Sequence, residues 1–257
     1  MRYIFTFMVF ALALLILFDK DFIGSKNLQL DRVVERVADL TYKAVEKYAK
    51  PELKQPTMQE SLSKLGADIG DHIFIRIFKL TAELEVWIKV GKRYRLLHNY
   101  EICMQSGYLG PKLKEGDFQG PEGFYYTSKA RLNPNSKYHL SFNIGYPNAY
   151  DRAYGRTGSA LMIHGGCLSV GCFAMTDEKI EEIYELVEEA LKGGQSIVRI
   201  HIFPFRMTDE NMQKYRENKW YDFWLNLKDG YDYFEKHGVP PNVEVVDKKY
   251  TFSKGEY

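Results

Sequence analysis

Residues 162–176 read MIHGGCLSVGCFAMT and combine a strand end, a glycine-rich turn and the start of a helix. His164 and Cys172 flank this turn, which can fold back and bring the imidazole within hydrogen-bonding distance of the thiol. The imidazole would then take the thiol proton and leave a thiolate, the nucleophilic form of cysteine. Gly171 permits a sharp turn, so that the N–H groups of Gly171 and Cys172 can stabilise an oxyanion. We therefore predict a catalytic group of Cys172, His164, Gly165 and Gly171.

The segment after this turn has the pattern of an amphipathic helix over residues 176–191. Thr176 is a good N-cap, Asp177 follows it in the first turn, and Gly193 ends the pattern. The positive end of the helix dipole would lie shortly after Cys172. We expect this dipole to favour the anionic sulfur.

The N-terminus carries an export signal. Arg2 precedes an unbroken apolar run over residues 3–18, which is typical of a secretory signal peptide. No small-residue cleavage site follows directly, so an uncleaved membrane anchor is an equal alternative. We assign residues 1–25 to this signal peptide or anchor and expect the rest of the chain in the periplasm, with membrane contact only through that segment.

The sequence contains three cysteines, Cys103, Cys167 and Cys172. An odd number in an exported chain indicates one free thiol beside at most one disulfide. We predict that Cys103 pairs with Cys167. Two other interpretations remain open. His164 and two cysteines could belong to a zinc site, although no fourth ligand is evident nearby, or the cysteines could simply be buried in a tight turn.

Outward from the turn, alternating apolar residues predict a β-rich α+β domain. We expect residues 70–257 to form one catalytic domain, preceded by a helical extension over residues 26–69 with helices at 31–48 and 59–65. The predicted strands are 73–78, 84–90 and 94–103 as an antiparallel meander, then 125–128, 138–144, 160–163 and 196–203. A helix over 209–227 and a hairpin of 243–246 with 250–253 complete the prediction. His139 and His201 are expected to be satisfied structural histidines on strands, while His72, His98 and His237 carry no functional signal.

The length and net charge of the chain limit the classes of binding partner to expect. A chain of 257 residues can bury one substantial core, and its net charge of +1 gives no electrostatic footprint for nucleic acid. We therefore expect no nucleic-acid partner.

The quoted segment is similar to the signature of the L,D-transpeptidase catalytic domain family, also called the YkuD-type domain. That family has His-Gly at a strand end and then Ser-His-Gly-Cys-x-Arg before a helix. Here the corresponding residues are His164-Gly165 and the segment 169–174, and the latter reads SVGCFA. The segments NIGYPNAYDR (143–152), PFRMTD (204–209) and GYDYF (230–234) resemble the YafK-like murein branch of the family. The resemblance covers roughly residues 70–250.

The resemblance implies a β-rich sandwich or barrel-like core with flanking helices. It also implies attack by Cys172 on the L-centre carbonyl of meso-diaminopimelate in a peptidoglycan stem peptide, through a thioester and without metal or cofactor. The YafK-like branch is associated with hydrolysis that frees wall-linked outer-membrane lipoprotein, and we favour that activity.

This sequence departs from the family signature at two positions. Val170 replaces the motif histidine, Ala174 replaces the motif arginine, and the interval between His164 and Cys172 is shorter than usual. Because of these departures, strict transpeptidation does not simply carry over from the family, and transpeptidation that forms cross-links or attaches protein is the alternative to hydrolysis. A non-catalytic wall-binding module and a zinc-dependent hydrolase are further alternatives.

Candidate substrate-binding residues lie close to the catalytic segment. Tyr146, Asn148, Tyr150 and Arg152 precede its strand, and Ser169 lies inside its turn. Arg152 and Lys112 could each pair with a stem-peptide carboxylate. For Arg152 the alternative is an exposed salt bridge, and for Lys112 it is a solvated side chain.

Overall fold

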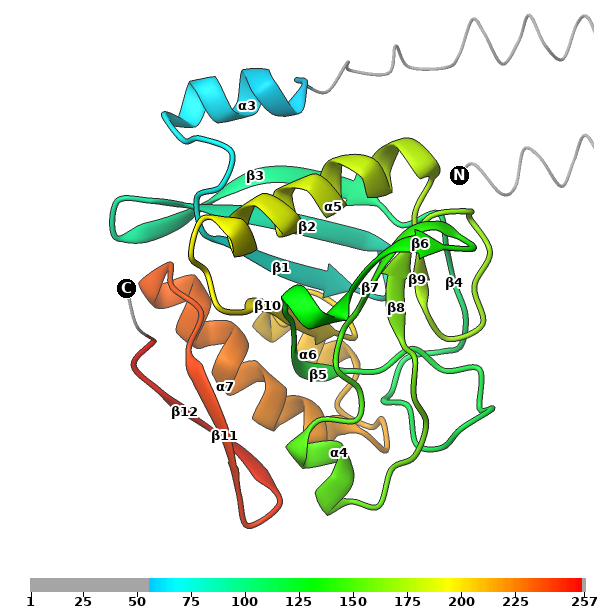
Figure 1. Cartoon of the computed structure of the whole chain (residues 1–257). Helices are drawn as coiled ribbons and strands as arrows, with labels where there is room; N and C mark the ends of the chain where they lie inside the picture. The colour runs from blue at the N-terminus through cyan, green and yellow to red at the C-terminus, as the bar shows by residue number, and fades with distance from the viewer. Residues whose placement is uncertain (1–55, 256–257) are drawn as a thin grey trace, which may run out of the picture. The chain divides into compact units, whose positions relative to one another are not determined.

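The computed structural model describes residues 56–255 (Figure 1). The predicted export segment and the predicted helix over residues 31–48 lie outside these residues. Among residues 56–255, no helix is both long and apolar enough to cross a membrane.

The first of two five-stranded sheets contains the predicted meander. Its order is β3-β2-β1-β10-β5, and β10 joins β1 in parallel while the other pairs are antiparallel. The strands are β1 (Ile73–Phe78), β2 (Glu83–Val90), β3 (Arg93–Glu101), β5 (Gly123–Thr127) and β10 (Val198–Phe203). The predicted antiparallel meander is confirmed for β1 to β3.

The second sheet has the order β4-β9-β8-β7-β6. Its strands are β4 (Met104–Gln105), β6 (Leu132–Ser136), β7 (His139–Asn143), β8 (Met162–His164) and β9 (Phe173–Ala174). β8 and β9 run parallel, and the other pairs are antiparallel. We did not predict β4, β6 or β9, because strands as short or as polar as these leave no alternating pattern in the sequence.

Helices and a hairpin flank the two sheets (Figure 1). They are α3 (Met58–Leu65), a 3-10 turn (Lys129–Arg131), α4 (Ala149–Ala153), α5 (Asp177–Lys192), α6 (Asp209–Lys214), α7 (Tyr221–His237), and the hairpin of β11 (Asn242–Val246) with β12 (Lys249–Ser253). Helices α3 and α5 and the hairpin confirm their predictions, and Thr176 caps α5 as expected. The predicted single helix over 209–227 is wrong. The chain leaves α6 at Tyr215, and the Asn218 side chain accepts from Trp220 N–H at 2.9 Å just before α7 begins.

Strand β1 of the first sheet is buried on both faces, and its side chains alternate between the two faces. Ile73, Ile75 and Ile77 pack in one apolar cluster with α5 and the second sheet, whereas Phe78 packs in another with α7. Helix α5 contacts β7 of the second sheet as well as β1 and β10 of the first. The observed architecture is thus the predicted α+β type, with two sheets and flanking helices.

Candidate active site

Strand pairing brings the two candidate catalytic residues to neighbouring segments of the second sheet. In the parallel pair of β8 and β9, Ile163 lies opposite Phe173 and His164 lies opposite Ala174. His164 is the last residue of β8, and Cys172 directly precedes β9. The register of β8 with β9 therefore places Cys172 beside the strand that carries His164.

The orientation of the His164 imidazole is set by a neighbouring carbonyl. His164 is 3% exposed, and its Nδ1 lies 2.6 Å from the carbonyl oxygen of Gly165. Since a carbonyl oxygen only accepts, Nδ1 carries the proton and Nε2 keeps its lone pair. The ring of Tyr138 packs on the imidazole with centroids 4.9 Å apart. His164 therefore has the tautomer that a general base requires.

The Cys172 thiol is half-buried beside backbone groups. Its Sγ lies 3.7 Å from the carbonyl oxygen of Ala160, to which the thiol donates. Burial raises the pKa of this thiol, while the N–H of Met162 and the positive charge of Lys112 act in the opposite direction. The burial effect is the larger, so the resting sulfur holds its proton and needs a base to become a nucleophile.

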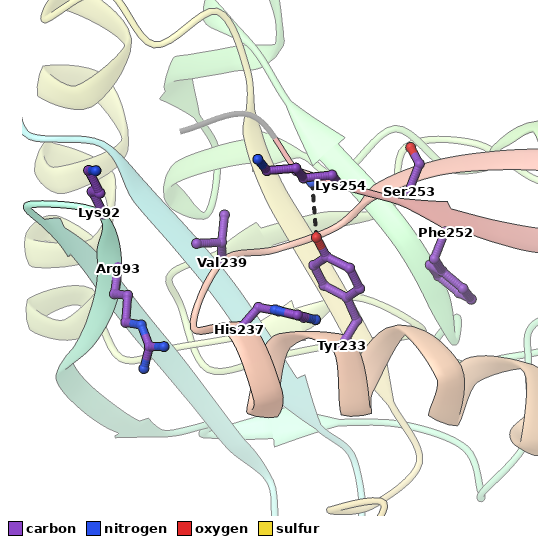
Figure 2. A pocket seen from close by; sticks show the side chains of 9 residues that line it. Lys92, Arg93, Tyr233, His237, Val239, Phe252, Ser253 and Lys254 are labelled. Atoms are coloured by element: carbon purple, nitrogen blue, oxygen red, sulfur yellow. Dashed lines mark hydrogen bonds between the residues drawn. The ribbon is translucent and has the colours of Figure 1, made fainter.

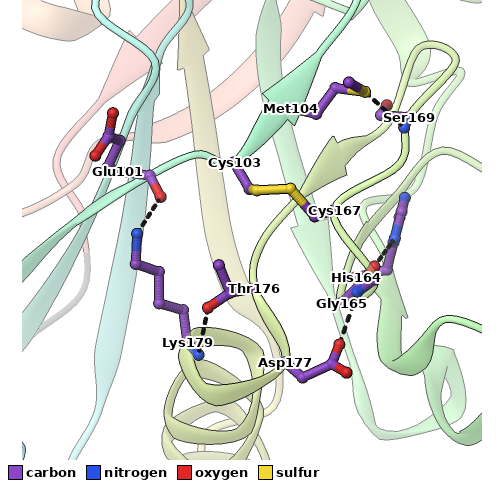
Figure 3. The surroundings of a disulfide bond; sticks show 11 residues. Glu101, Cys103, Met104, His164, Gly165, Cys167, Ser169, Thr176, Asp177 and Lys179 are labelled. Atoms are coloured by element: carbon purple, nitrogen blue, oxygen red, sulfur yellow. Dashed lines mark hydrogen bonds between the residues drawn. A yellow bond between two sulfur atoms is a disulfide. The ribbon is translucent and has the colours of Figure 1, made fainter. Parts of the chain in front are cut away.

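The turn between these residues is fastened at several points (Figure 3). Cys103 and Cys167 form a disulfide with a Cα–Cα distance of 5.4 Å, which confirms the predicted pairing and leaves Cys172 as the free cysteine. Ser169 donates through its hydroxyl to the carbonyl of Cys172 at 2.6 Å and through its N–H to the sulfur of Met104 at 3.4 Å. The role predicted for Ser169 in substrate binding stays a prediction beside this observed contact.

The disulfide also bears on the zinc alternative. The Cys167 sulfur is bonded to Cys103 and is therefore not a free thiolate ligand. Within residues 56–255, no three His, Cys, Asp or Glu side chains lie close enough together to hold a metal ion.

The first residue of α5 fastens the turn. Asp177 accepts from the N–H of Gly166 at 2.8 Å (Figure 3). Strand β9 separates Cys172 from the first residue of α5 by about five extended residues, roughly 16 Å of chain. The predicted influence of the α5 dipole on the Cys172 sulfur stays a prediction.

Gly171 has the backbone conformation that its role requires. Its φ of 102° lies in the region that favours glycine. Among the described residues, the N–H groups of Gly171 and Cys172 have no hydrogen-bond acceptor. The oxyanion role of these two N–H groups stays a prediction.

The residues predicted to bind substrate upstream of β8 make contacts within the protein. The Tyr146 hydroxyl donates to the carbonyl of Lys112, the Asn148 side chain caps α4, and the Tyr150 ring stacks on Tyr250 with centroids 4.4 Å apart. Arg152 is exposed and donates to the carbonyl of Pro147. Their contact with substrate stays a prediction, beside these observed structural roles.

Two further expectations about single side chains need correction. Lys112 is not solvated but 5% exposed. His201 is buried as expected, but it is not satisfied, because its Nδ1 has no hydrogen-bond partner. His139, by contrast, is satisfied by Glu181, 2.6 Å away at the surface. Sequence reasoning also missed Tyr138 and Asp177, which touch the site only through strand pairing and the fold of the turn.

A pocket of about 620 Å³ lies at the C-terminal end of α7, lined among others by Arg93, Tyr233, His237 and Phe252 (Figure 2). None of the candidate catalytic residues lines it. The pocket is therefore separate from the site built around His164 and Cys172.

Comparison with known proteins decides the family. The family model described as the L,D-transpeptidase catalytic domain (YkuD) matches residues 40–202. The chain belongs to the L,D-transpeptidase catalytic domain family. The match begins before the predicted domain boundary at residue 70, which stays a prediction.

Individual relatives agree with the L,D-transpeptidase assignment. The chain is 50% identical over 186 residues to the protein named "Putative L,D-transpeptidase YafK" of Escherichia coli strain K12, covering 72% of this chain and 76% of that protein. The same figures hold for the protein of that name from Escherichia coli O157:H7. The chain is thus a peptidoglycan-acting enzyme of the L,D-transpeptidase family.

Solved structures resemble the chain more loosely. The helical cell shape determining protein Pgp2 from Campylobacter jejuni (K307A mutant) gives a TM-score of 0.43 at 19% identity, over 74% of this chain and 80% of that one. Bd1075 from Bdellovibrio bacteriovorus gives 0.37 at 20% identity, over 64% and 62%. Likenesses of this size add nothing to the family assignment.

Proposed function

We propose that this enzyme hydrolyses the amide at the L-centre carbonyl of meso-diaminopimelate in peptidoglycan stem peptides, and that it thereby frees wall-linked lipoprotein. The observation that supports the proposal is a free thiol, Cys172, directly before β9 and next to the strand that ends in His164, whose Nδ1 is held by a carbonyl. The family supplies the substrate class, and the half-buried sulfur supplies the nucleophile.

The proposed first half-reaction assigns one step to each of these groups. Nε2 of His164 takes the thiol proton, and the Cys172 sulfur attacks the amide carbonyl to give a tetrahedral oxyanion. The N–H groups of Gly171 and Cys172 stabilise the oxygen. The C–N bond then breaks, His164 returns the proton to the leaving amine, and a thioester remains on Cys172.

The second half-reaction separates hydrolysis from transpeptidation. Water attacks the thioester, loses a proton to His164, and releases a stem peptide with a free carboxylate together with the regenerated thiol. If an amine attacks instead, a new amide forms. The short turn between His164 and Cys172, with its disulfide, leaves little chain from which to build a dedicated site for a bulky acceptor, which favours water.

The test uses purified peptidoglycan that carries covalently bound lipoprotein. We expect the wild-type enzyme to release lipoprotein with a free amine and to leave stem peptides that end in diaminopimelate, whereas Cys172→Ala releases none. In water enriched in ¹⁸O, mass spectrometry should find one ¹⁸O atom in the new carboxylate.

The other outcomes identify the alternatives. New cross-links without ¹⁸O would show transpeptidation. Identical products from wild type and Cys172→Ala, with equal binding of both to the wall, would contradict the enzymatic proposal and indicate a binding module.

We further propose that residues 1–25 direct the enzyme to the periplasm. The support is the apolar run behind Arg2. Fusing residues 1–25 to a reporter that is active only after export should give activity, and fusing a copy with two arginines inside the run should not. Equal reporter activity from both fusions would contradict the assignment.

A further inference from the structure

A loop outside the catalytic turn forms the wall beside Cys172. This wall loop, residues 107–121, lies against both neighbours of the cysteine. The Gln119 carbonyl oxygen is 3.5 Å from the point where a Cβ on Gly171 would stand. A Cβ on Gly120 would be 3.5 Å from the Phe173 ring. The wall loop therefore packs directly against the residues on either side of Cys172.

Lys112 is a buried cation in the wall loop. It is 5% exposed, and its Nζ donates to Asp117 at 2.6 Å and to the carbonyl of Lys114 at 2.9 Å. Its Cε lies 2.9 Å from the Cβ position of Gly158, two residues before Ala160, whose carbonyl accepts from the Cys172 thiol. The lysine stem and the catalytic sulfur thus flank the same short segment.

Asp117 holds the ammonium in place. Its carboxylate accepts from the N–H groups of Leu113, Lys114 and Gln119 as well as from Lys112. These bonds outweigh partial burial and lower the pKa of Asp117. Since the carboxylate has so many other donors, it anchors the loop and does not belong to Lys112 alone.

We propose that Lys112 is a positioning residue whose fixed positive charge stabilises the thiolate of Cys172. The inference rests on the proposed catalytic role of Cys172. Lys112 exchanges no proton with the substrate. It offsets part of the cost that burial imposes on the anion, and His164 remains the base. The other charged or titratable groups around Lys112 and the sulfur include His164 on β8, Tyr146, whose hydroxyl donates to the carbonyl of Lys112, and Tyr108, Lys114, Glu115 and Asp117 in the wall loop.

The test measures the thiol itself. Cys172 is the free cysteine and the other two are paired, so alkylation of the oxidised full-length protein by iodoacetamide reports one sulfur. The rate against pH gives the midpoint of thiolate formation. We expect Lys112→Met to raise this midpoint by about 0.5–1 pH unit, which slows alkylation at neutral pH about threefold to tenfold.

Three further variants separate charge from loop structure. Lys114→Met removes an equal charge from the same loop and should leave the midpoint unchanged, and Lys112→Arg should restore it. Asp117→Asn keeps the ammonium and removes its counter-charge, so the midpoint should fall or stay at the wild-type value. If the substitutions act by loosening the wall loop, both Lys112→Met and Asp117→Asn should instead raise the midpoint of thiolate formation.

The results can overturn the inference without touching the proposed function. Equal midpoints for Lys112→Met and Lys114→Met, or a raised midpoint for Asp117→Asn, would contradict it. If Lys112→Met does not fold, two other variants still test the inference. It requires a midpoint at the wild-type value in Lys112→Arg and a midpoint no higher than wild type in Asp117→Asn. Activity on peptidoglycan is measured separately. If Lys112→Met shifts the midpoint but the wild-type enzyme releases no lipoprotein, the proposed function is contradicted and the inference about Lys112 stands.

Discussion

At the scale of single residues, Gly165 shows how tightly the site is built. Its carbonyl fixes the His164 tautomer at 2.6 Å. A Cβ at Gly165 would lie 2.6 Å from Oδ1 of Asp177, 2.9 Å from Ile180 and 3.0 Å from the carbonyl oxygen of Tyr138. Because two of these neighbours belong to the start of α5, a side chain here would push the helix from the sheet.

We expect Gly165→Ala to lower the free energy of unfolding by about 1–3 kcal/mol, as overpacking in a rigid interior does. Activity should fall as well, because the carbonyl that orients His164 shifts. Urea denaturation and turnover of peptidoglycan check both effects. Gly120→Ala is the matched control, since its Cβ would meet the Phe173 ring at an ordinary 3.5 Å. Equal unfolding free energies for the two variants would contradict this account.

At the scale of elements, the turn over residues 165–171 depends on its fastenings. The disulfide joins it to the residue before β4, and Asp177 of α5 holds Gly166. Leu168 and Val170 are 64% and 66% exposed, so the turn buries few apolar side chains of its own. Polar and covalent links, not a local core, give it its shape.

We expect the double variant Cys103→Ser with Cys167→Ser to lose stability and activity together. The two cysteines are 64 residues apart, and closing a loop of that size stabilises a fold by up to about 4 kcal/mol. Thermal unfolding and turnover check the prediction, and wild type in a reductant should behave like the variant. If the reduced protein keeps its full activity, the turn does not need the covalent link.

Elements also show where sequence reasoning succeeds and where it stops. The strand over 73–78 and the helix after Thr176 follow from period-2 and period-3.6 patterns, and the His164–Cys172 pair follows from residue chemistry. The two-residue β9 has no period to detect, yet its register with β8 is what brings the segment of Cys172 beside the strand of His164. The break at Asn218 and the burial of Lys112 depend on tertiary contacts, which a single sequence does not reveal.

At the scale of the whole molecule, one buried ion pair joins the first sheet, the wall loop and α7. Nζ of Lys79 is 3.0 Å from Glu122 and also donates to the carbonyls of Gly110 and Gly120. The other oxygen of Glu122 accepts from the indole N–H of Trp224 on α7 at 2.8 Å. The pair thus links the end of β1, the wall loop and α7.

We expect Lys79→Met to destabilise the protein by about 3–5 kcal/mol, because it leaves the Glu122 charge buried without its cation. Lys79→Met combined with Glu122→Gln should recover part of this loss. Urea denaturation of the two single variants and the double variant gives the coupling energy. A double variant as unstable as the sum of the single variants would show that the two charges do not interact.

A buried histidine makes the stability of the whole fold depend on pH. His201 on β10 is 1% exposed and lies between the rings of Phe74 and Phe124, with centroids at 4.6 and 4.7 Å. Burial first, and then the charges of Arg199 and Arg76, hold the pKa of His201 well below its usual range. The folded protein therefore keeps this ring neutral under conditions in which an unfolded chain would protonate it.

The sign of the effect follows from proton linkage. Below the unfolded pKa of about 6.5 the unfolded chain binds a proton that the folded chain does not, so the free energy of unfolding falls as pH decreases, by up to about 1.4 kcal/mol per unit. His201→Phe removes this titration and should flatten the decline between pH 6.5 and 5, which urea denaturation at several pH values measures. His139→Gln, at the surface beside Glu181, is the control and should keep most of the wild-type decline. An unchanged slope in His201→Phe would assign the acid sensitivity to other groups, of which His98 is the next candidate, since burial lowers its pKa too.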